Sequence, residues 1–268
     1  MNIQEIMKRI NLPQEAQNMV EKYPMEEERY QNQRQLFYKD SKTFFEKWEK
    51  TEERFQWILC FYLKLACEVY EEYKEKRISD SVFDDTFYDI AIWCEECYRK
   101  YGVYGLEEAP WVANSLKMKL FRLGRLQFEP MVLQTELGNE KLKLKKGSRV
   151  LNIHIPAGEK MDYDACLSSI KMAEEFFGDT YEAYICDSWL LSPVLKELLP
   201  ETSNIVRFQN LFRIVKVYHD YPQAEGRIFK DIREDKENYQ EDSSLQRKVK
   251  KYVLSGKDIG IGVGMFYR

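Results

Sequence analysis

The stretch RVLNIHIPAG at positions 149–158 alternates apolar and polar residues and then breaks at Pro-Ala-Gly. A period of two is typical of a β-strand, and it places Asn152 and His154 on one face and the apolar side chains on the other. Asp162 follows the break, where it is placed to cap a helix over residues 163–177. The expected inward face of this helix is Ala165, Leu167, Ile170, Ala173 and Phe177. The order strand, loop, helix predicts one unit of an α/β sheet.

A second unit of the same kind follows. YEAYICD (181–187) predicts a strand, the CDSW segment (186–189) a loop after it, and Ser192 with Pro193 the start of another helix. Parallel strands need a crossover that a helix usually provides, so the two strands are expected to be parallel neighbours. The loop after His154 and the CDSW segment then lie at the same carboxyl edge of the sheet, where open α/β sheets bind ligands.

Further strands complete this half of the chain. Alternation predicts strands over 126–135, 140–145 and 149–155, with turns at Gly138-Asn139 and Lys146-Gly147, and later strands at LFRIVKVY (211–218), GRIFKDI (226–232) and DIGIGVGMFYR (258–268). Ser243 and Gln246 have the spacing of a capping box that opens a helix ending at Gly256. No helix follows the glycines of the last strand, so they are no dinucleotide fingerprint.

The first half of the chain has a helical period. Apolar residues recur at spacings of three, four and seven from Phe44 to Tyr73, which predicts one amphipathic helix. Ser81-Val-Phe-Asp84 predicts a capping box that opens a second helix, and Pro110 opens a third that Gly124 ends. Because the period changes from helical to alternating at Gly124, we expect a helical domain over 1–124 and an α/β domain over 125–268.

Composition narrows the class of protein. The 268 residues are 44% hydrophobic and carry a net charge of −4, which predicts a globular protein without the basic surface that nucleic acids select. The apolar run Trp57–Leu63 is far short of the ~18 residues of a membrane span, and MNIQEIMKRI has no signal-peptide pattern. A cytoplasmic location with reduced cysteines is expected. Cys94 and Cys97 lie within a helical pattern without further ligands, so no metal site is predicted.

The two loops at the carboxyl edge offer candidate site residues, each with a plain alternative. His154 suits a general base because its reference pKa lies near neutral pH, or it satisfies a neighbour in a polar pocket. Cys186 is either a nucleophile or a packed side chain. Asp187 and Ser188 either contact a ligand or tie the turn to backbone amides, and Trp189 is a hydrophobic anchor or turns its indole N–H to a ligand.

The loop after His154 offers backbone amides. Those of residues 157–162 precede a helix and are placed to hold a phosphate group. Lys160 favours an anion there, whereas Glu159 and Asp162 oppose it.

Four segments of the chain together resemble a bacterial family of acyltransferases, which has an N-acyltransferase N-terminal helical domain and a GNAT-like C-terminal domain. The segments are LFRLGRLQFEP (120–130), RVLNIHIPAGEKMDYDACLSSIKMAEEFF (149–177), YICDSWLLSPVLKELLPETSNIVRFQNLF (184–212) and SSLQRKVKKYVLSGKDIGIGVGMF (243–266). The resemblance implies a mixed GNAT-type sheet with flanking helices. It also implies that the strands before Pro156 and Cys186 splay to admit the pantetheine arm of an acyl-CoA.

The resemblance further implies roles for individual residues. The amides of Ala157, Gly158, Glu159 and Lys160 would hold the CoA pyrophosphate, and His154 would accept the proton of an amine acceptor. From their positions in the two strand-loop segments, and not from the resemblance, Asn152, Asp187 and Trp189 are the candidates for contact with that acceptor. PAGEKMD (156–162) stands where the family's wider superfamily has a glycine signature, and WLLSPVLKELLP (189–200) lacks its tyrosine acid, so Ser188 or Cys186 would protonate the departing thiolate.

The leading hypothesis is therefore an acyltransferase that moves an acyl group from acyl-CoA to an amine of a small molecule or peptide, without a metal, nucleic acid or membrane. The first alternative is a GNAT-like scaffold that has lost catalysis and binds a metabolite or a protein partner. The second is thiol chemistry through Cys186.

Overall fold

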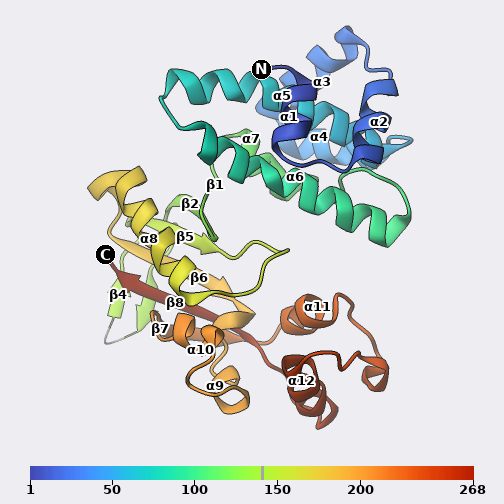
Figure 1. The fold of residues 1–268 in the computed structure, drawn as a ribbon. Helices are drawn as coiled ribbons and strands as arrows, with labels where there is room; N and C mark the ends of the chain where they lie inside the picture. Colours follow the sequence, from blue (N-terminus) through green and yellow to red (C-terminus); the bar gives the residue numbers. More distant parts are fainter. Residues whose placement is uncertain (140–141) are drawn as a thin grey trace. The chain divides into compact units, whose positions relative to one another are not determined.

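The computed structural model describes residues 1–139 and 142–268, and it divides into two compact units, Met1–Leu123 and Gly124–Arg268 (Figure 1). The first unit is helical, and the second is built on a mixed sheet with helices. Among the described helices, none combines the length and the apolar character that crossing a membrane requires.

The first unit contains seven helices and a short terminal strand. Their bounds are α1 Ile3–Arg9, α2 Gln14–Lys22, α3 Glu27–Lys39, α4 Ser41–Trp48, α5 Arg54–Glu75, α6 Asp80–Tyr101, α7 Ala109–Leu116 and β1 Phe121–Leu123. The helix predicted from Phe44 to Tyr73 is two helices, because Glu53 adopts a left-handed backbone (φ 52°) before α5. The indole of Trp48 closes this break by donating to the Arg54 carbonyl. The predicted continuous helix was therefore wrong.

Long α5 and α6 form the centre of this unit. Aromatic side chains join the two helices, with Tyr70 and Tyr73 of α5 in edge contact with Phe83 of α6. α6 begins at Asp80 and Ser79 caps it, so the capping box predicted at Ser81 was wrong. The third helix also ends earlier than predicted, at Leu116, and β1 follows it.

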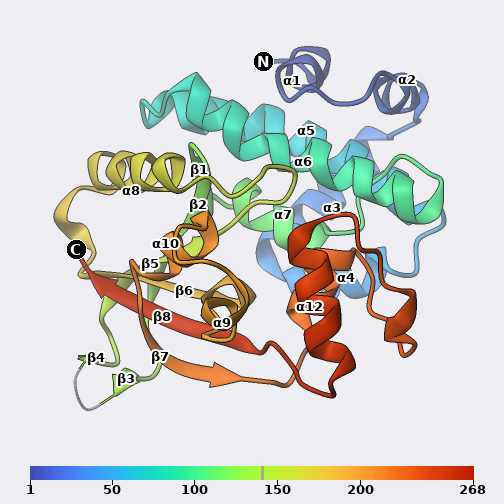
Figure 2. The same ribbon diagram turned by 60° about the horizontal axis from the view of Figure 1, so that its bottom comes forward.

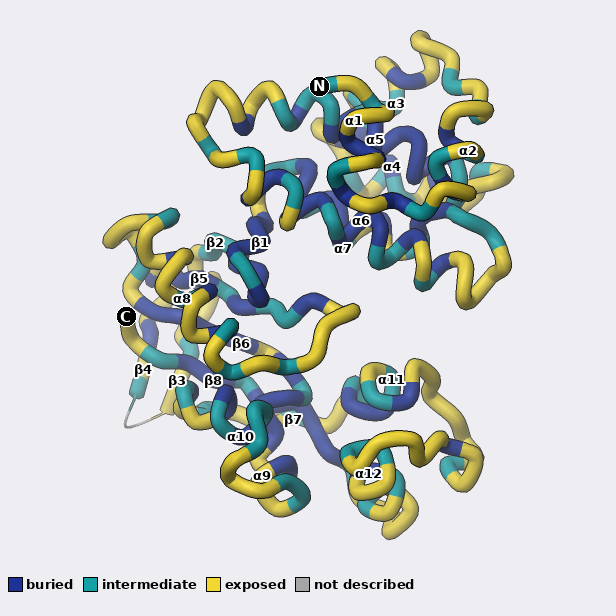
Figure 3. The backbone as a smooth tube through the Cα atoms, viewed as in Figure 1, coloured by how far each residue is buried: buried dark blue, intermediate teal, exposed yellow. Residues whose placement is uncertain are grey.

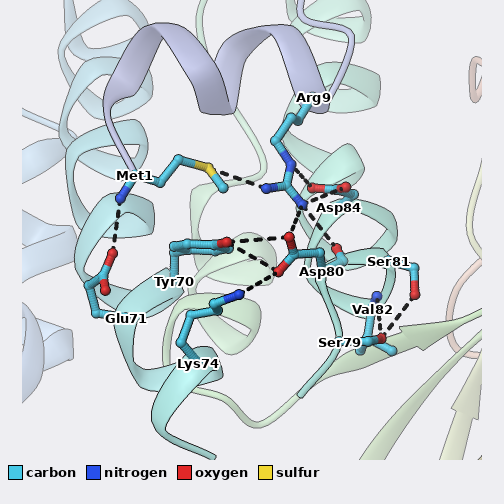
Figure 4. A network of polar contacts seen from close by, with 10 residues as sticks. All are labelled: Met1, Arg9, Tyr70, Glu71, Lys74, Ser79, Asp80, Ser81, Val82 and Asp84. Atoms are coloured by element: carbon cyan, nitrogen blue, oxygen red, sulfur yellow. Dashed lines mark hydrogen bonds and ion pairs between the residues drawn. The ribbon is translucent and has the colours of Figure 1, made fainter. Parts of the chain in front are cut away.

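A polar network ties α1 to α5 and α6 (Figure 4). Arg9 makes a two-pronged contact with Asp84, with Nε 2.7 Å from Oδ1 and Nη2 2.8 Å from Oδ2. The hydroxyl of Tyr70 on α5 donates to Asp80 at the start of α6. The Arg9–Asp84 pair raises the pKa of the guanidinium further above its ordinary value. The network pairs these charged side chains with one another and so links the three helices.

The second unit contains the sheet. Its strands are β2 Leu126–Val132, β3 Leu137–Asn139, β4 Leu142–Leu144, β5 Arg149–His154, β6 Ala183–Ser188, β7 Arg213–Tyr218 and β8 Ile261–Tyr267. Its helices are α8 Tyr163–Phe177, η1 Gly178–Thr180, η2 Trp189–Leu191, α9 Leu195–Leu198, α10 Asn204–Gln209, α11 Gln223–Phe229, η3 Lys236–Asn238 and α12 Ser244–Leu254. The strand order within this unit is β2-β5-β6-β8-β7, and β3 pairs with β4 separately (Figure 2).

Strand β5 pairs with β6 in parallel, as the two strand-loop-helix units predicted, and the pairs β2–β5, β6–β8 and β7–β8 are antiparallel. The mixed sheet with flanking helices confirms the expected fold class. Residues 140–141 of the strand predicted at 140–145 lie outside the described residues. The turn predicted at Gly138-Asn139 was wrong, because both residues belong to β3.

The register of the strands defines two faces of the sheet. Residues directly opposite each other on paired strands point to the same side. His154, Asn152 and Val150 of β5 therefore share a side with Glu129 of β2 and Asp187 of β6, which we call the His154 face. The opposite side, the Cys186 face, holds Leu151, Ile153, Tyr184, Cys186, Ser188 and Phe266. Figure 3 shows the central strands β5, β6 and β8 largely buried, whereas β7 at the edge is partly exposed.

The β3–β4 hairpin covers the apolar part of the His154 face. Leu137, Leu142 and Leu144 of the hairpin pack with Val150, Ala183, Ile185 and Met265. These sheet residues lie toward the amino ends of β5 and β6. The carboxyl ends of the same two strands carry the polar residues of this face.

Helix α8 approaches the β2 strand through its small residues. Its buried side chains are Cys166, Ser169 and Ala173, whereas Leu167 is 39% exposed. Of the predicted inward face, Ala173 is buried and Ala165, Ile170 and Phe177 are half-buried, whereas the prediction was wrong for Leu167. Ser169 accepts hydrogen bonds from the amides of Arg125 and Leu126, and such a close backbone approach requires a small side chain at that position.

Segment 226–232, predicted as a strand, belongs in part to helix α11 and was also wrong. Phe229 of this helix stacks on Tyr239 at 4.0 Å, and its neighbour Ala224 joins the same cluster with Val249 of α12. The capping box of Ser243 and Gln246 is confirmed at the start of α12. Residues 223–229 therefore form a helix because of tertiary packing, although the local sequence pattern predicted a strand over 226–232.

The glycines of β8 let a turn pack directly on the sheet. Gly262 and Gly264 lie on the Cys186 face, where a Cβ on Gly262 would stand 2.2 Å from the Leu191 carbonyl oxygen. A Cβ on Gly264 would stand 2.8 Å from Phe212 Cβ. The alternating glycines therefore serve packing of η2 and the segment after α10.

Gly262→Ala is expected to destabilise the protein by about 1–3 kcal/mol, since the added methyl group meets rigid backbone. Gly226→Ala is the matched control, because the nearest atom to its Cβ is 3.5 Å away and alanine favours α11 by up to ~1 kcal/mol. Chemical denaturation of both variants measures the difference. Equal stability of the two variants would contradict the packing described for β8.

Candidate active site

The polar end of β5 lies next to a carboxylate on β2. Glu129 stands opposite Asn152 in the antiparallel pair, and His154 stands two residues further along the same face. His154 Nε2 is 2.9 Å from Glu129 Oε2, and Asn152 Nδ2 donates to the same oxygen at 3.2 Å. His154 and Glu129 are about one quarter exposed, at 23% and 26% of their side chains. The alternation that predicted a shared face for Asn152 and His154 is confirmed.

The contact with Glu129 sets the chemistry open to His154. A carboxylate beside one ring nitrogen favours the tautomer that carries its proton there. With the proton on Nε2, the ring donates to Glu129 and Nδ1 is the accepting nitrogen, whereas with the proton on Nδ1, Nε2 accepts from Asn152 Nδ2 at 3.1 Å. Glu129 would also stabilise the imidazolium that forms when the ring accepts a proton, as the orienting acid does in a catalytic triad.

The ladder between β5 and β6 ends before the strands do. Its register pairs run from Val150↔Ala183 to Asn152↔Ile185, whereas β5 continues to His154 and β6 to Ser188. On its other side, β6 stays paired with β8 along its full length. His154 and Asp187 thus occupy corresponding positions on two strands that are no longer paired with each other.

The loop between β5 and α8 continues from this opening. Ala157, Gly158, Glu159 and Lys160 are exposed, and Gly158 adopts a positive φ of 90°. Asp162 caps α8 by accepting from the amide of Ala165 at 2.7 Å, as predicted. On the inner side of the loop, the guanidinium of Arg125 donates to three of the loop carbonyls. Arg125 was not predicted, because no local pattern links it to a loop more than thirty residues later.

Asp187 is the other polar group of the His154 face near the opening. It is exposed, and its Oδ1 accepts a hydrogen bond of 2.6 Å from the hydroxyl of Tyr218 on β7. Burial and the Asp187 carboxylate raise the pKa of Tyr218, which keeps the phenol protonated as the donor. Tyr218 was not predicted, because β7 and β6 are brought together only through β8.

Comparison with known families identifies this arrangement. Residues 120–266 match the family described as the GNAT-like C-terminal domain, and residues 1–118 match the N-acyltransferase N-terminal domain. The chain belongs to the GNAT-like C-terminal domain family. The two-domain acyltransferase expected from the resemblance is confirmed, and the protein is an acyltransferase by its family. No curated protein shows a significant match to the sequence.

Solved acyltransferases share the fold of this GNAT-like protein. One in complex with decanoyl-CoA and teicoplanin is 19% identical, with a TM-score of 0.77 over 98% of this chain and 87% of that chain. A mutant in complex with octanoyl-CoA is 19% identical, with a TM-score of 0.78 over the same shares. A third, in complex with decanoyl-CoA, is 17% identical, with a TM-score of 0.67 over 99% of both chains.

Cys186 and Ser188 lie away from His154. Both belong to β6 rather than to a loop, and the alternation of the strand turns them to the Cys186 face. Cys186 is fully buried, and burial raises the pKa of its thiol. Ser188 is also buried, and its hydroxyl accepts from the Leu190 amide. The structure thus separates these two predicted residues from His154, and the burial of Cys186 disfavours thiol chemistry at this residue.

Trp189 begins the η2 turn after β6. Its amide donates to Gln223, and its side chain packs against the cluster formed by α9, α11 and α12. This packing agrees with the hydrophobic anchor, which was one of the two roles predicted for Trp189. Among the described residues, no group of three or more His, Cys, Asp or Glu side chains is arranged to hold a metal ion.

Alkylation of the native protein tests the placement of Cys186. We expect iodoacetamide to modify the partly exposed Cys67 first, although burial raises the pKa of that thiol to about 11. Cys186 should react only after unfolding, because its thiol is buried and rarely ionised. Peptide mass mapping before and after denaturation gives the order, and rapid modification of native Cys186 would restore the thiol hypothesis.

Proposed function

We propose that this protein transfers an acyl group from acyl-CoA to an amine of a small molecule or a peptide. The observation that carries the proposal is the His154–Glu129 pair at the edge where the β5–β6 ladder ends. Membership of the GNAT-like family supports the reaction class. The solved structures that share the fold hold decanoyl-CoA, octanoyl-CoA and teicoplanin, which supports donors longer than acetyl-CoA and acceptors of peptide character.

The donor would enter between the separated ends of β5 and β6. An acyl-pantetheine arm is extended and carries amides, so it fits between two strand ends whose mutual pairing has stopped at Asn152↔Ile185. Its thioester would then lie beside His154 at the end of β5. The exposed loop over 157–160 continues from the same opening and is assigned to the pyrophosphate.

The reaction balances with His154 as the only titrating group. The acceptor nitrogen forms a bond to the thioester carbonyl carbon while His154 takes the amine proton, and Glu129 stabilises the resulting imidazolium. The C–S bond then breaks, and His154 returns the proton to the departing thiolate. The products are the amide and CoA, with the enzyme unchanged. No role falls to Cys186 or Ser188, which face the other side of the sheet.

The acceptor would bind on the His154 face. Asn152 is held by Glu129, and Asp187 is held by Tyr218, so both side chains are positioned before the acceptor arrives. The Asp187 carboxylate attracts the cationic form of an amine, which releases one proton to solvent before its neutral form attacks the thioester. Trp189 is not assigned to the acceptor, because its packing lies with α9, α11 and α12.

Ligand binding is expected to raise the thermal midpoint of the protein. A ligand at 100 times its Kd that binds only the folded state stabilises it by ~2.7 kcal/mol. Acetyl-CoA, octanoyl-CoA and decanoyl-CoA are compared by thermal unfolding, with free pantetheine as a weak-binding control. If none of the CoA thioesters shifts the midpoint, the proposal fails and the non-catalytic GNAT-like scaffold takes its place.

His154→Ala is expected to lower kcat by about 10²–10⁴-fold while leaving the Kd for acyl-CoA unchanged, because the general base is lost and the donor site is kept. Glu129→Gln keeps the shape but removes the carboxylate, so a smaller loss of about tenfold is expected. Release of free thiol in the presence of an amine acceptor measures the rates.

Cys186→Ala is the control for the same assay, and it should keep the activity of the natural protein. A larger loss in Cys186→Ala than in His154→Ala would contradict the assignment of the base.

A further inference from the structure

The loop assigned to the pyrophosphate lacks a glycine signature, yet a single buried cation holds its backbone in place. The side chain of Arg125 is 5% exposed. Its guanidinium donates Nη1 to Pro156 O at 3.1 Å, Nη2 to Glu159 O at 2.9 Å and Nε to Lys160 O at 3.2 Å. One side chain therefore binds three carbonyls of the same loop.

The backbone of Arg125 is held in turn by α8, the helix that follows the loop. Its amide donates to Ser169 Oγ at 2.8 Å, and Ser169 lies on α8, the helix that follows the loop. A second side chain acts in the same direction, because Asn204 Nδ2 of α10 donates to Met161 O at 3.0 Å. The carbonyls of Pro156, Glu159, Lys160 and Met161 are thus drawn toward the interior of the second unit.

Because the peptide group is planar, the direction of each loop carbonyl also fixes the direction of the N–H group of the next residue. In a trans peptide, the N–H of a residue points opposite to the C=O of the residue before it, and none of the described residues, including the whole of this loop, has a cis peptide bond. Inward carbonyls at 156, 159, 160 and 161 therefore direct the N–H groups of Ala157, Lys160, Met161 and Asp162 to the outer side of the loop. Outward amides in series form an anion-binding surface.

We propose that Arg125 is a positioning residue for acyl-CoA: it holds the carbonyl side of the 156–161 loop so that the loop amides face the diphosphate of the donor. The inference rests on the proposed function and deepens it by naming what replaces the absent glycine signature. Arg125 acts through the backbone and makes no contact with the reacting atoms. Its effect is confined to the diphosphate, because the thioester end of the donor lies at His154.

The experiment compares two acyl donors that differ in the diphosphate. Octanoyl-CoA carries the group, and the octanoyl thioester of pantetheine lacks it. The natural protein should prefer octanoyl-CoA in kcat/KM. Arg125→Gln should raise the KM for octanoyl-CoA by about tenfold, with kcat nearly unchanged and the pantetheine thioester used as before, since hydrogen bonds to the loop are lost.

Three further variants separate positioning from damage to the fold. Arg125→Lys keeps the charge but cannot bind three carbonyls, so it should behave like Arg125→Gln. Asn204→Ala should give the same selective loss at a smaller size, since it releases one carbonyl. Arg207→Gln is the matched control, because Arg207 contacts Asp164 of α8 and none of the loop carbonyls, and it should leave both donors unaffected. Thermal midpoints of all variants are measured alongside.

The outcomes are distinct. An equal loss with both donors, or full rescue by Arg125→Lys, would overturn the positioning role. So would an unchanged donor preference in Arg125→Gln. If the natural protein uses neither donor, the proposed acyl transfer is wrong, and the role of Arg125 that rests on it is overturned as well.

Discussion

The parallel pairing of β5 with β6 is the constraint on which the rest of the second unit depends. Because the two strands run in the same direction, both end at one edge of the sheet, and the segments that follow them start from the same place. The pairing stops at Asn152↔Ile185 while β5 and β6 each remain joined to an outer neighbour. The sheet therefore stays intact on both sides of the two strand ends that are not paired with each other.

The two faces of the sheet differ in role: the Cys186 face is packed, and the His154 face carries the polar residues of the candidate site. On the Cys186 face, glycines of β8 let η2 pack on the strand, and Gln209 of α10 donates to the carbonyls of Leu190 and Ser192. On the His154 face, the hairpin β3–β4 covers only the apolar amino ends. At the polar carboxyl ends, His154 is half-buried and Asp187 is exposed. A buried thiol on one side and a carboxylate-paired imidazole on the other explain why we assign the proton transfer to His154.

The loop after β5 shows how a backbone site can form without the residues that usually mark it. A glycine-rich loop presents amides because its backbone is free to adopt the required conformation. Here only Gly158 has a positive φ in the loop, and side chains from outside it bind the carbonyls instead. The same orientation of amides is reached through hydrogen bonds from Arg125 and Asn204 rather than through chain flexibility.

Several features were already decided by the sequence. The period of two in 149–154 placed Asn152 and His154 together, Asp162 capped α8, and the order of strand, loop and helix led to a parallel pair. These are local properties, set by alternation, capping and the geometry of a crossover. The resemblance of four segments was enough to predict the family, since it depends on order and spacing along the chain.

Other features appear only in the tertiary structure. Glu129, Arg125 and Tyr218 reach the site from β2, from the turn before it and from β7, at sequence distances that no local pattern connects. Which side of α8 is buried depends on the turn at Arg125, whose amide binds the small Ser169. The helix at 223–229 depends on packing in the cluster that contains Tyr239. The sequence by itself determined the two strand-loop-helix units and the face of β5 on which His154 lies. Long-range packing and hydrogen bonding alone decided which partners surround it, because those free energies arise only between segments that folding brings together.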